Sequence, residues 1–398
     1  MDLSAIISFA QAHRGEDAVR LMLQRDRYPG VEMTLVAQQL EGMAQAEGKW
    51  PSWAACPEVC YPPKVNREQS SSEATARYKA SLVGGGEGAD LTGGMGVDCY
   101  FMSLGTQQMH YCEQSEELCR LALHNYTALG QTNILVHKGD SLAWLQNCSE
   151  KQFDYLYVDP ARRDSHGGRV TAFEDCQPNL LECLPLLRSR CQRLLVKASP
   201  MLDLQLATTQ LGEVAEVHIV AVGGECREML FLCGQLATDS QEPSIVCVNL
   251  RATGRDEHRF TRSEEQNAPY RNAAEVERYL YEPHAALMKG GCYRLLSQWY
   301  DLGALDAHSH LYTSEKLQED FPGRVFEVEQ RLRLDAKSLR RVLPEGKAHV
   351  VCRNYPVRAD QLQRQLGLAE GGDHYLIATT HAGTRVGLLC RLLKSALR

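Results

Sequence analysis

Several hallmarks of common protein classes are missing from this 398-residue sequence. No apolar run approaches the ~18 residues that a membrane-spanning helix needs. The opening residues, MDLSAIISFAQAHRGEDAV, lack the basic segment and the long apolar core of a signal peptide, so we expect a cytoplasmic protein. Otherwise the composition is that of an ordinary globular protein, and the length predicts two or three domains.

Paired cysteine motifs are also missing. The 15 cysteines are scattered and include no C-x-x-C pair. Cys56 and Cys60 lie closest together in the sequence, and there is no second closely spaced pair that could complete a metal site with them. Because zinc sites usually show tight paired spacing, we predict no metal site. Scattered cysteines in odd number are typical of buried free thiols in a reducing compartment.

Basic residues are also fewer than acidic ones in this sequence. The net charge of −7 argues against a protein that coats nucleic acid. The charges are unevenly distributed, however. From Phe321 to the end there are 14 Lys+Arg and 7 Asp+Glu residues, whereas the residues before Phe321 include 29 Lys+Arg and 43 Asp+Glu. A basic end on an acidic body indicates an interaction surface, although a merely solvated surface can show the same asymmetry.

Strand-like and helix-like stretches alternate over residues 89–234. The predicted strands are ADLT, QQMHYCE, NILVHKG, FDYLYVD, RLLVKAS, EVHIVAV and EMLFLCG. Helical periodicity fills most of the intervals, which implies an α/β fold with a mostly parallel sheet covered on both faces. Only a short loop, GGECR, separates the last two strands, so we expect an antiparallel pair at one edge. This arrangement is typical of a class I (Rossmann-like) methyltransferase core rather than a dehydrogenase.

The flanking sequence divides into further segments. Residues 1–70 read as helical, with a break at Pro29-Gly30, and precede the α/β core at 71–238. Residues 239–320 read as a small α+β module. Its predicted strands are SIVCVNL, HRFTR and HSHLYTSE, and APYRNAAEVERYLYE is a predicted helix. Residues 321–398 repeat a strand–helix theme.

A glycine-rich turn follows the first predicted strand of the core. In ADLTGGMGVD the strand ends at Asp90, and Gly93, Gly94 and Gly96 turn the chain into a helix. Glycine lets a backbone approach a ligand closely, so we expect this turn, with Thr92, to bind a cofactor.

The residues after this turn disfavour a dinucleotide. A dinucleotide site needs another glycine three residues after Gly96 and places a pyrophosphate at the helix start. Cys99 occupies that position, and Asp98 adds negative charge near it. S-adenosylmethionine (SAM) has no phosphate and carries an ammonium and a sulfonium. It therefore fits better, with Asp90 holding the ammonium.

Acids also follow the next two strands. Glu113 can accept both ribose hydroxyls, and Asp140, followed by Ser141, can accept from the adenine amine. Because ligands of open α/β sheets bind at the carboxyl ends of the strands, near the switch in strand order, we predict one SAM site from these residues and the glycine turn. Alternatively, Asp140 and Ser141 only cap a helix.

The fourth predicted strand ends in the sequence DPARRD. Amino-group methyltransferases commonly carry a D/N-P-P-aromatic turn here, in which the acid accepts the hydrogens of the target amine and the aromatic stacks on the base. We predict that Asp159, Pro160 and Arg162 are catalytic, because positioning supplies much of the rate. Arg162 or Arg163 can stack on a base or hold a phosphate. Alternatively, both arginines pair locally with Asp164.

The fifth predicted strand argues against a covalent mechanism. Uracil-C5 methyltransferases carry a nucleophilic cysteine before an Asn-Pro there, whereas this sequence has KASP from Lys197 to Pro200. Without that cysteine, covalent attack is not expected and transfer is direct. Lys197 is then a candidate substrate contact at the rim of the site.

The segments SSEATARYKA, DLTGGMGVD, YVDPARRD, GGECRE and CRNYPVRADQL…GGDHYLIATT together resemble the bacterial class I SAM-dependent methyltransferases that carry a C-terminal THUMP-like domain. The resemblance covers most of the chain from about Ser70. It implies a ferredoxin-like module at 239–320 and a THUMP-like domain at 321–398. Since THUMP domains assist RNA-modification enzymes, it also implies an RNA substrate, a tRNA or an rRNA.

The resemblance suggests a use for the basic end of the chain. We predict that this end holds RNA through its phosphates, while Arg163 and Lys197 contact the substrate near the reaction. The candidate contacts are Arg331, Arg333, Lys337, Arg340, Arg341, Arg353 and Arg358. The alternative is an interdomain seam in which these cations pair with Glu327, Glu329, Asp335 and the acidic body.

Other functions stay open on the sequence. The methyltransferase could act on a protein or a small molecule, with the basic domain serving another purpose. The core could also bind SAM or RNA without catalysis. A nicotinamide enzyme is the weakest alternative, because of the glycine spacing and Asp98.

Overall fold

The computed structural model describes residues 3–148, 152–162, 173, 176–177, 179–234 and 242–395. The chain forms two compact units, Met1–Ala215 with Leu230–Asp239 and Glu216–Met229 with Ser240–Arg398. No described helix is long and apolar enough to cross a membrane. The cysteines whose side chains the structure describes are free thiols.

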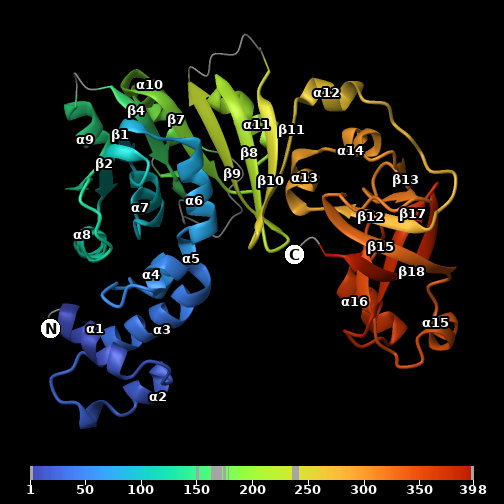
Figure 1. The fold of residues 1–398 in the computed structure, drawn as a ribbon, viewed down its shortest axis with the longest axis horizontal. Coiled ribbons are helices and arrows are strands. Elements are labelled where there is room, and N and C mark those ends of the chain that lie inside the picture. The colour runs from blue at the N-terminus through green and yellow to red at the C-terminus, as the bar shows by residue number, and fades with distance from the viewer. Residues whose placement is uncertain are drawn as a thin grey trace. The chain divides into compact units, whose positions relative to one another are not determined.

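The first unit begins with a helical region, drawn in blue in Figure 1. Its helices are α1 (Leu3–Ala12), α2 (Ala18–Met22), α3 (Met33–Lys49), α4 (Pro51–Ala54) and α5 (Lys64–Gln69). The apolar face of α3, with Val36 and Leu40, packs into a cluster that contains Trp50 and Trp53. Arg67 of α5 is buried and pairs with Glu41 of α3 at 2.9 Å, which anchors α5 to this cluster.

An open α/β sheet forms the core that follows. Its strands are β1 (Gly85–Asp90), β2 (Thr106–Glu113), β3 (Ile134–Lys138), β4 (Phe153–Val158), β7 (Cys191–Ala198), β8 (Val214–Val222), β9 (Glu225–Gly234), β10 (Ser244–Arg251) and β11 (Gly254–Phe260). The helices along this part of the chain are α6 (Glu73–Leu82), α7 (Val97–Ser103), α8 (Glu116–Ala128), α9 (Ser141–Asn147), α10 (Leu180–Arg190) and α11 (Leu204–Leu211).

The strand order is β11-β10-β8-β9-β7-β4-β1-β2-β3. β1 pairs in parallel with both β2 and β4. From β1 the chain moves outward through β2 to β3, and from β4 it moves the other way through β7. The switch in strand order therefore falls between β1 and β4, which is where open α/β sheets bind their ligands. The predicted mostly parallel sheet is confirmed.

β1 begins earlier than predicted. The glycine-rich stretch before ADLT, residues 85–88, supplies most of this strand. A Cβ at Gly88 would lie 2.3 Å from the Tyr155 ring. Glycine in β1 thus lets the bulky tyrosine of β4 pack closely against it.

β10 and β11 extend the sheet. β10 pairs in parallel with β8, and β11 pairs antiparallel with β10. SIVCVNL is therefore a strand, as predicted, and so is the first part of HRFTR, whose last two residues cap and begin α12 (Arg262–Asn267); both strands join the large sheet. The β8–β9 hairpin, expected at the edge, lies inside it. The reason is that Ile245, Val246, Cys247 and Val248 are all buried, so β10 needs cover on both faces.

The second unit contains a seven-stranded sheet with the order β13-β14-β12-β15-β18-β17-β16. Its strands are β12 (Tyr279–Pro283), β13 (Gly303–Ala304), β14 (Tyr312–Ser314), β15 (Gly323–Leu332), β16 (His349–Cys352), β17 (His374–His381) and β18 (Thr384–Lys394). The helices are α12 (Arg262–Asn267), α13 (Ala285–Gly290), α14 (Arg294–Trp299), α15 (Ala336–Val342) and α16 (Ala359–Leu366).

The helix predicted for APYRNAAEVERYLYE is wrong. Its last residues form β12, which pairs antiparallel with β14 and β15. Leu280 and Tyr281 of this strand are buried. Burial within a sheet outweighs the helical periodicity of the sequence.

Candidate active site

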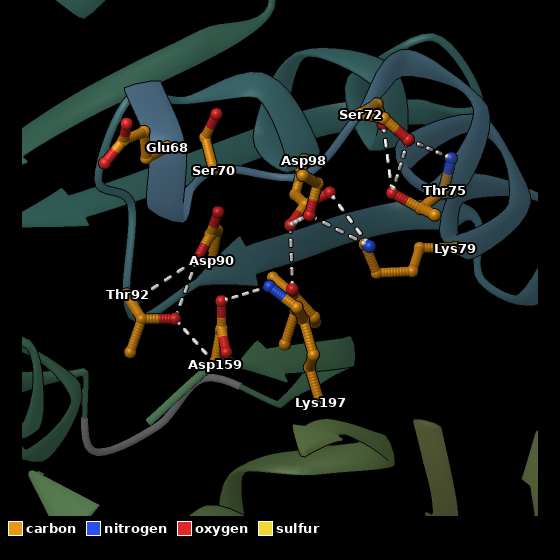
Figure 2. Close-up of polar contacts among 12 residues, drawn as sticks. Glu68, Ser70, Ser72, Thr75, Lys79, Asp90, Thr92, Asp98, Asp159 and Lys197 are labelled. Atoms are coloured by element: carbon orange, nitrogen blue, oxygen red, sulfur yellow. Dashed lines mark hydrogen bonds and ion pairs between the residues drawn. The ribbon is translucent and has the colours of Figure 1, made fainter. Parts of the chain in front are cut away.

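The ends of β1 and β4 meet at the switch point (Figure 2). The Asp90 carboxylate accepts hydrogen bonds from the Thr92 backbone N–H at 3.0 Å and from its hydroxyl at 3.4 Å. The Thr92 hydroxyl oxygen in turn accepts from the Asp159 backbone N–H at 2.7 Å. Thr92, predicted as a cofactor contact, therefore joins the two acidic turns.

The glycines of the first turn allow close packing against two tyrosines. A Cβ at Gly93 would lie 2.3 Å from the Tyr111 ring, and one at Gly96 would lie 2.3 Å from the Tyr126 hydroxyl. Tyr111 donates to the Gly94 carbonyl at 2.6 Å, and Tyr126 to the Gly96 carbonyl at 3.1 Å. Gly94 and Gly96 also have positive φ angles, 54° and 85°, which favour glycine. Sequence reasoning missed both tyrosines.

Glu113, at the end of β2, is held against the glycine turn. Its carboxylate accepts from the Gly94 N–H at 2.9 Å and from the Ser115 N–H at 2.8 Å. A carboxylate oxygen has a second lone pair, so both oxygens can still accept from a ligand. The structure thus brings Glu113, Gly94 and Asp90 to one edge of the sheet.

Asp140, predicted at the same edge, follows the outermost strand β3. Its side chain accepts from the Ala143 N–H at 2.8 Å and caps α9. The capping alternative is therefore what the structure describes for Asp140 and Ser141, and a ligand contact there stays a prediction.

Asp159 and Lys197 form an ion pair. The Lys197 ammonium, on β7, lies 2.5 Å from the Asp159 carboxylate, and the side chains are 14% and 37% exposed. Pro160 follows, and the Arg162 backbone lies in the short strand β5 (Ala161–Arg162). The Arg162 side chain and all of Arg163 lie outside the described residues.

A second ion pair lies beside the first (Figure 2). Lys79 of α6 is completely buried, 3.3 Å from the Asp98 carboxylate at the start of α7. Asp98 also accepts from the Ser71 and Tyr157 hydroxyls, each at 2.8 Å. The negative charge that the sequence placed at the helix start is thus compensated. Ser71 and Lys79 lie in SSEATARYKA, which carried part of the family resemblance but gave neither residue a role.

Comparisons with known proteins match this geometry. Family models match residues 279–322, as a ferredoxin-like domain, and residues 323–392, as a THUMP domain-like region. The crystal structure of a "putative methyltransferase" from Porphyromonas gingivalis W83 is 32% identical, has a TM-score of 0.88 and matches over 98% of each chain. The chain belongs to this methyltransferase family.

The protein is thus a methyltransferase that carries a C-terminal THUMP-like domain. Weaker matches include M. capricolum TrmK in complex with S-adenosyl-homocysteine (12% identity, TM-score 0.33, 42% of this chain and 70% of that chain). An rRNA methylase from Streptococcus thermophilus also matches (12% identity, TM-score 0.29, 40% of this chain and 92% of that chain). No curated protein matches.

Two buried carboxyl groups of this methyltransferase have opposite electrostatic environments. Burial, reinforced by the charges of Asp98 and Asp159, raises the pKa of Asp90 to about 8. Burial would also raise the pKa of Asp98, but Lys79 and Lys197 outweigh it and hold that pKa below its ordinary value. Asp98 is therefore ionised and paired with Lys79, whereas Asp90 still gains from a nearby cation.

The predicted RNA contacts of the methyltransferase divide into two groups. Arg353 pairs with the buried Glu282 of β12 at 2.6 Å, and the same carboxylate pairs with Arg324. Arg358 pairs with Asp360 at 3.3 Å. The other predicted contacts are exposed, and the described residues give none of them an ion pair: Arg331, Arg333, Lys337, Arg340 and Arg341.

The acids proposed to pair with those free cations have other partners. Glu327 pairs with Arg278 at 2.9 Å, and Glu329 pairs with Arg391 at 3.1 Å. Asp335 caps α15 by accepting from the Ser338 N–H at 2.8 Å. Within the described part of the second unit, none of these five cations has an ion pair, and Arg333 interacts electrostatically with Asp335. No group of side chains among the described residues has the composition of a metal site.

Proposed function

We propose that this methyltransferase modifies a base of RNA, in a tRNA or an rRNA, by direct in-line transfer. The observation that carries the proposal is that the Asp159 turn adjoins Asp90 through Thr92 at the switch point. An acid that can orient an acceptor thereby lies next to an acid that can hold the donor. Incorporation of a labelled methyl group into RNA, in a product that ribonuclease degrades, tests the proposal.

The first turn suits SAM as its ligand. Asp90 offers a buried carboxyl to the ammonium, and the Glu113 oxygens can accept the ribose hydroxyls. A Cβ at Gly94 would meet only the Thr92 carbonyl, at 3.9 Å, so the backbone there is open to a ligand. Asp140 and Ser141 are proposed for the adenine. When bound, SAM supplies a methyl group activated by its sulfonium.

The second turn suits an amine acceptor. The Asp159 carboxylate and turn carbonyls can accept the hydrogens of a base amine and so direct its lone pair. Lys197 holds that carboxylate in place at 2.5 Å. As the nitrogen gains a methyl group it loses a proton, which the partly exposed Asp159 can pass to water. Ala198 stands where a covalent mechanism would need cysteine.

SAM affinity should rise with pH and level off above about pH 8. Asp90, whose pKa burial raises to about 8, must be ionised to hold the ammonium, so binding releases a proton below that pH. Asp90→Asn should weaken binding by roughly 1.5–3 kcal/mol and remove this pH dependence. Calorimetry across pH measures both effects.

Asp203→Asn is the matched control, because Asp203 only caps α11. It should leave affinity and pH dependence unchanged. An affinity for SAM that does not vary with pH would contradict the role of Asp90. Binding of NADH without binding of SAM would contradict the whole cofactor assignment.

The exposed cations without an ion pair should bind RNA through its phosphates. Arg340→Gln/Arg341→Gln should weaken binding to bulk tRNA and flatten the salt dependence by about two units, one for each lost contact. Arg353→Gln should flatten the slope less, because Arg353 is held in an ion pair with the buried Glu282. Filter binding over a salt series measures the slopes. Equal salt slopes for the wild type, the double variant and Arg353→Gln would show that these cations do not bind the RNA.

A further inference from the structure

The ion pair of Asp159 with Lys197 is set by the register of the sheet. In the parallel ladder of β4 and β7, Val158 lies opposite Val196, and Asp159 and Lys197 are the next residues along the two chains. Their charged groups lie 2.5 Å apart. An acceptor that reaches the Asp159 carboxylate therefore also comes close to the positive charge of Lys197 (Figure 2).

A second carboxylate supports this positive charge. Although burial opposes it, Lys79 and then Lys197 hold the pKa of Asp98 below its ordinary value, so Lys197 is attracted by Asp98 as well as by Asp159. Two nearby carboxylates favour the protonated form of the lysine. Its side chain is only 14% exposed, so water screens the charge incompletely. The site thus keeps a cation beside the acid that faces the acceptor.

An exocyclic amine gains little from such a cation. Its nitrogen is neutral before the transfer and becomes positive as the new bond forms, so the Lys197 ammonium opposes the reaction. The sequence departs from the amine-directed turn as well, because Ala161 and Arg162 replace its second proline and its aromatic. Asp159 alone suits an amine, but the pair of Asp159 with Lys197 suits a different acceptor better.

A ring N–H beside a carbonyl has the opposite requirement. Its nitrogen becomes a good nucleophile only when the proton leaves, and the resulting negative charge is shared between the nitrogen and the carbonyl oxygen. Asp159 can accept the proton as a positioned base. Lys197 can stabilise the negative charge, because a fixed cation acts strongly where charge develops in a reaction.

We propose that the reacting nitrogen is a ring N–H beside a carbonyl, as at N1 of guanine or N3 of uracil, with Asp159 as its base and Lys197 as the cation that stabilises the anion. The inference rests on the proposed methylation of an RNA base and specifies a ring N–H in place of an exocyclic amine. The proton passes to Asp159 and then to water. The electron pair of the nitrogen forms the bond to the methyl carbon, the electron pair of the C–S bond stays on sulfur, and the methylated base is neutral.

The position of a labelled methyl group tests this inference. Full-length protein is given labelled SAM and bulk tRNA and rRNA from a deletion strain, and the RNA is then digested to nucleosides. The label should appear in a nucleoside of the proposed class, such as N1-methylguanosine or N3-methyluridine. Label in N6-methyladenosine, N4-methylcytidine or any other nucleoside outside this class would overturn the inference, although methylation of RNA would stand. RNA without label would overturn the proposed function and the inference with it.

Lys197→Met separates an electrostatic role from a structural one. At saturating RNA and neutral pH it should slow single-turnover transfer by about 10²–10³-fold, the cost of losing one group that stabilises a developing negative charge. The defect should shrink as pH rises, because hydroxide then ionises the base without help. Lys197→Arg keeps the charge and should retain most of the rate.

Lys138→Met is the matched control, because it removes a lysine that pairs with Glu116 at the end of β3. It should leave the rate unchanged at every pH. A defect of Lys197→Met that is the same at every pH, or a wild-type rate in that variant, would overturn the role of Lys197. A Lys197→Arg protein as slow as Lys197→Met would also contradict a role that depends on charge.

Discussion

Replacing Asp159 by alanine should lower the rate of methyl transfer to RNA by about 10²–10⁴-fold, the range for a positioned group that handles a proton in the reaction. SAM affinity should change little, because Asp159 is proposed to orient the acceptor and not the donor. Loss of its negative charge should, if anything, favour ionisation of Asp90, whose pKa Asp159 helps to raise. Single-turnover rates and calorimetry on the same preparation measure both effects.

Asp159→Asn and a double variant serve as controls. Asparagine keeps the shape of the turn and its backbone bond to Thr92, so a similar loss of rate would identify the carboxylate as the group that matters. Asp159→Asn/Lys197→Met removes both charges and tests whether an unpaired Lys197 causes the defect. A wild-type rate in Asp159→Ala on saturating RNA would show that Asp159 is only a turn residue.

Lys79→Met should reduce the free energy of unfolding by about 3–5 kcal/mol, because it leaves the buried Asp98 without its cation. Lys79→Met/Asp98→Asn should recover part of this loss, since no uncompensated charge remains. Lys64→Gln, on helix α5, breaks an exposed pair with Glu68 and should cost less than about 1 kcal/mol. Urea denaturation measures all three.

The Asp98 network should also make stability depend on acid pH. The pKa of Asp98 is lower in the folded protein than its ordinary value, so its contribution is present above the unfolded pKa and is lost as pH falls through the folded pKa. The single variant Lys79→Met should lose much of this contribution. A Lys79→Met protein as stable as the wild type at neutral pH would contradict the account of this pair.

The outline of the site was predictable from the sequence because it follows from strand ends. Asp90, Glu113 and Asp159 each end a recognisable apolar strand, and parallel strands place those ends along one edge. The sequence gives no distances between strands, so the ion pair of Asp159 with Lys197 could not be foreseen. The sequence identified Asp159 and Lys197 as site residues, but it assigned them separate roles.

Other parts were hidden because they depend on packing between distant segments. Lys79 reads as an ordinary helix residue, and only the fold buries it beside Asp98. Tyr111 reads as one more apolar residue of its strand, although its ring occupies the space that Gly93 leaves free. Likewise, β10 joined the large sheet because of its neighbours, which no local pattern records.

The most direct test of the central claim is mass spectrometry of nucleosides from total tRNA and rRNA of a deletion strain and its parent. One methylated nucleoside should disappear in the deletion strain. It should return when the wild-type gene is restored and stay absent when the restored gene carries Asp159→Ala. Identical nucleoside profiles in the deletion strain and its parent would contradict the proposal that this methyltransferase acts on RNA.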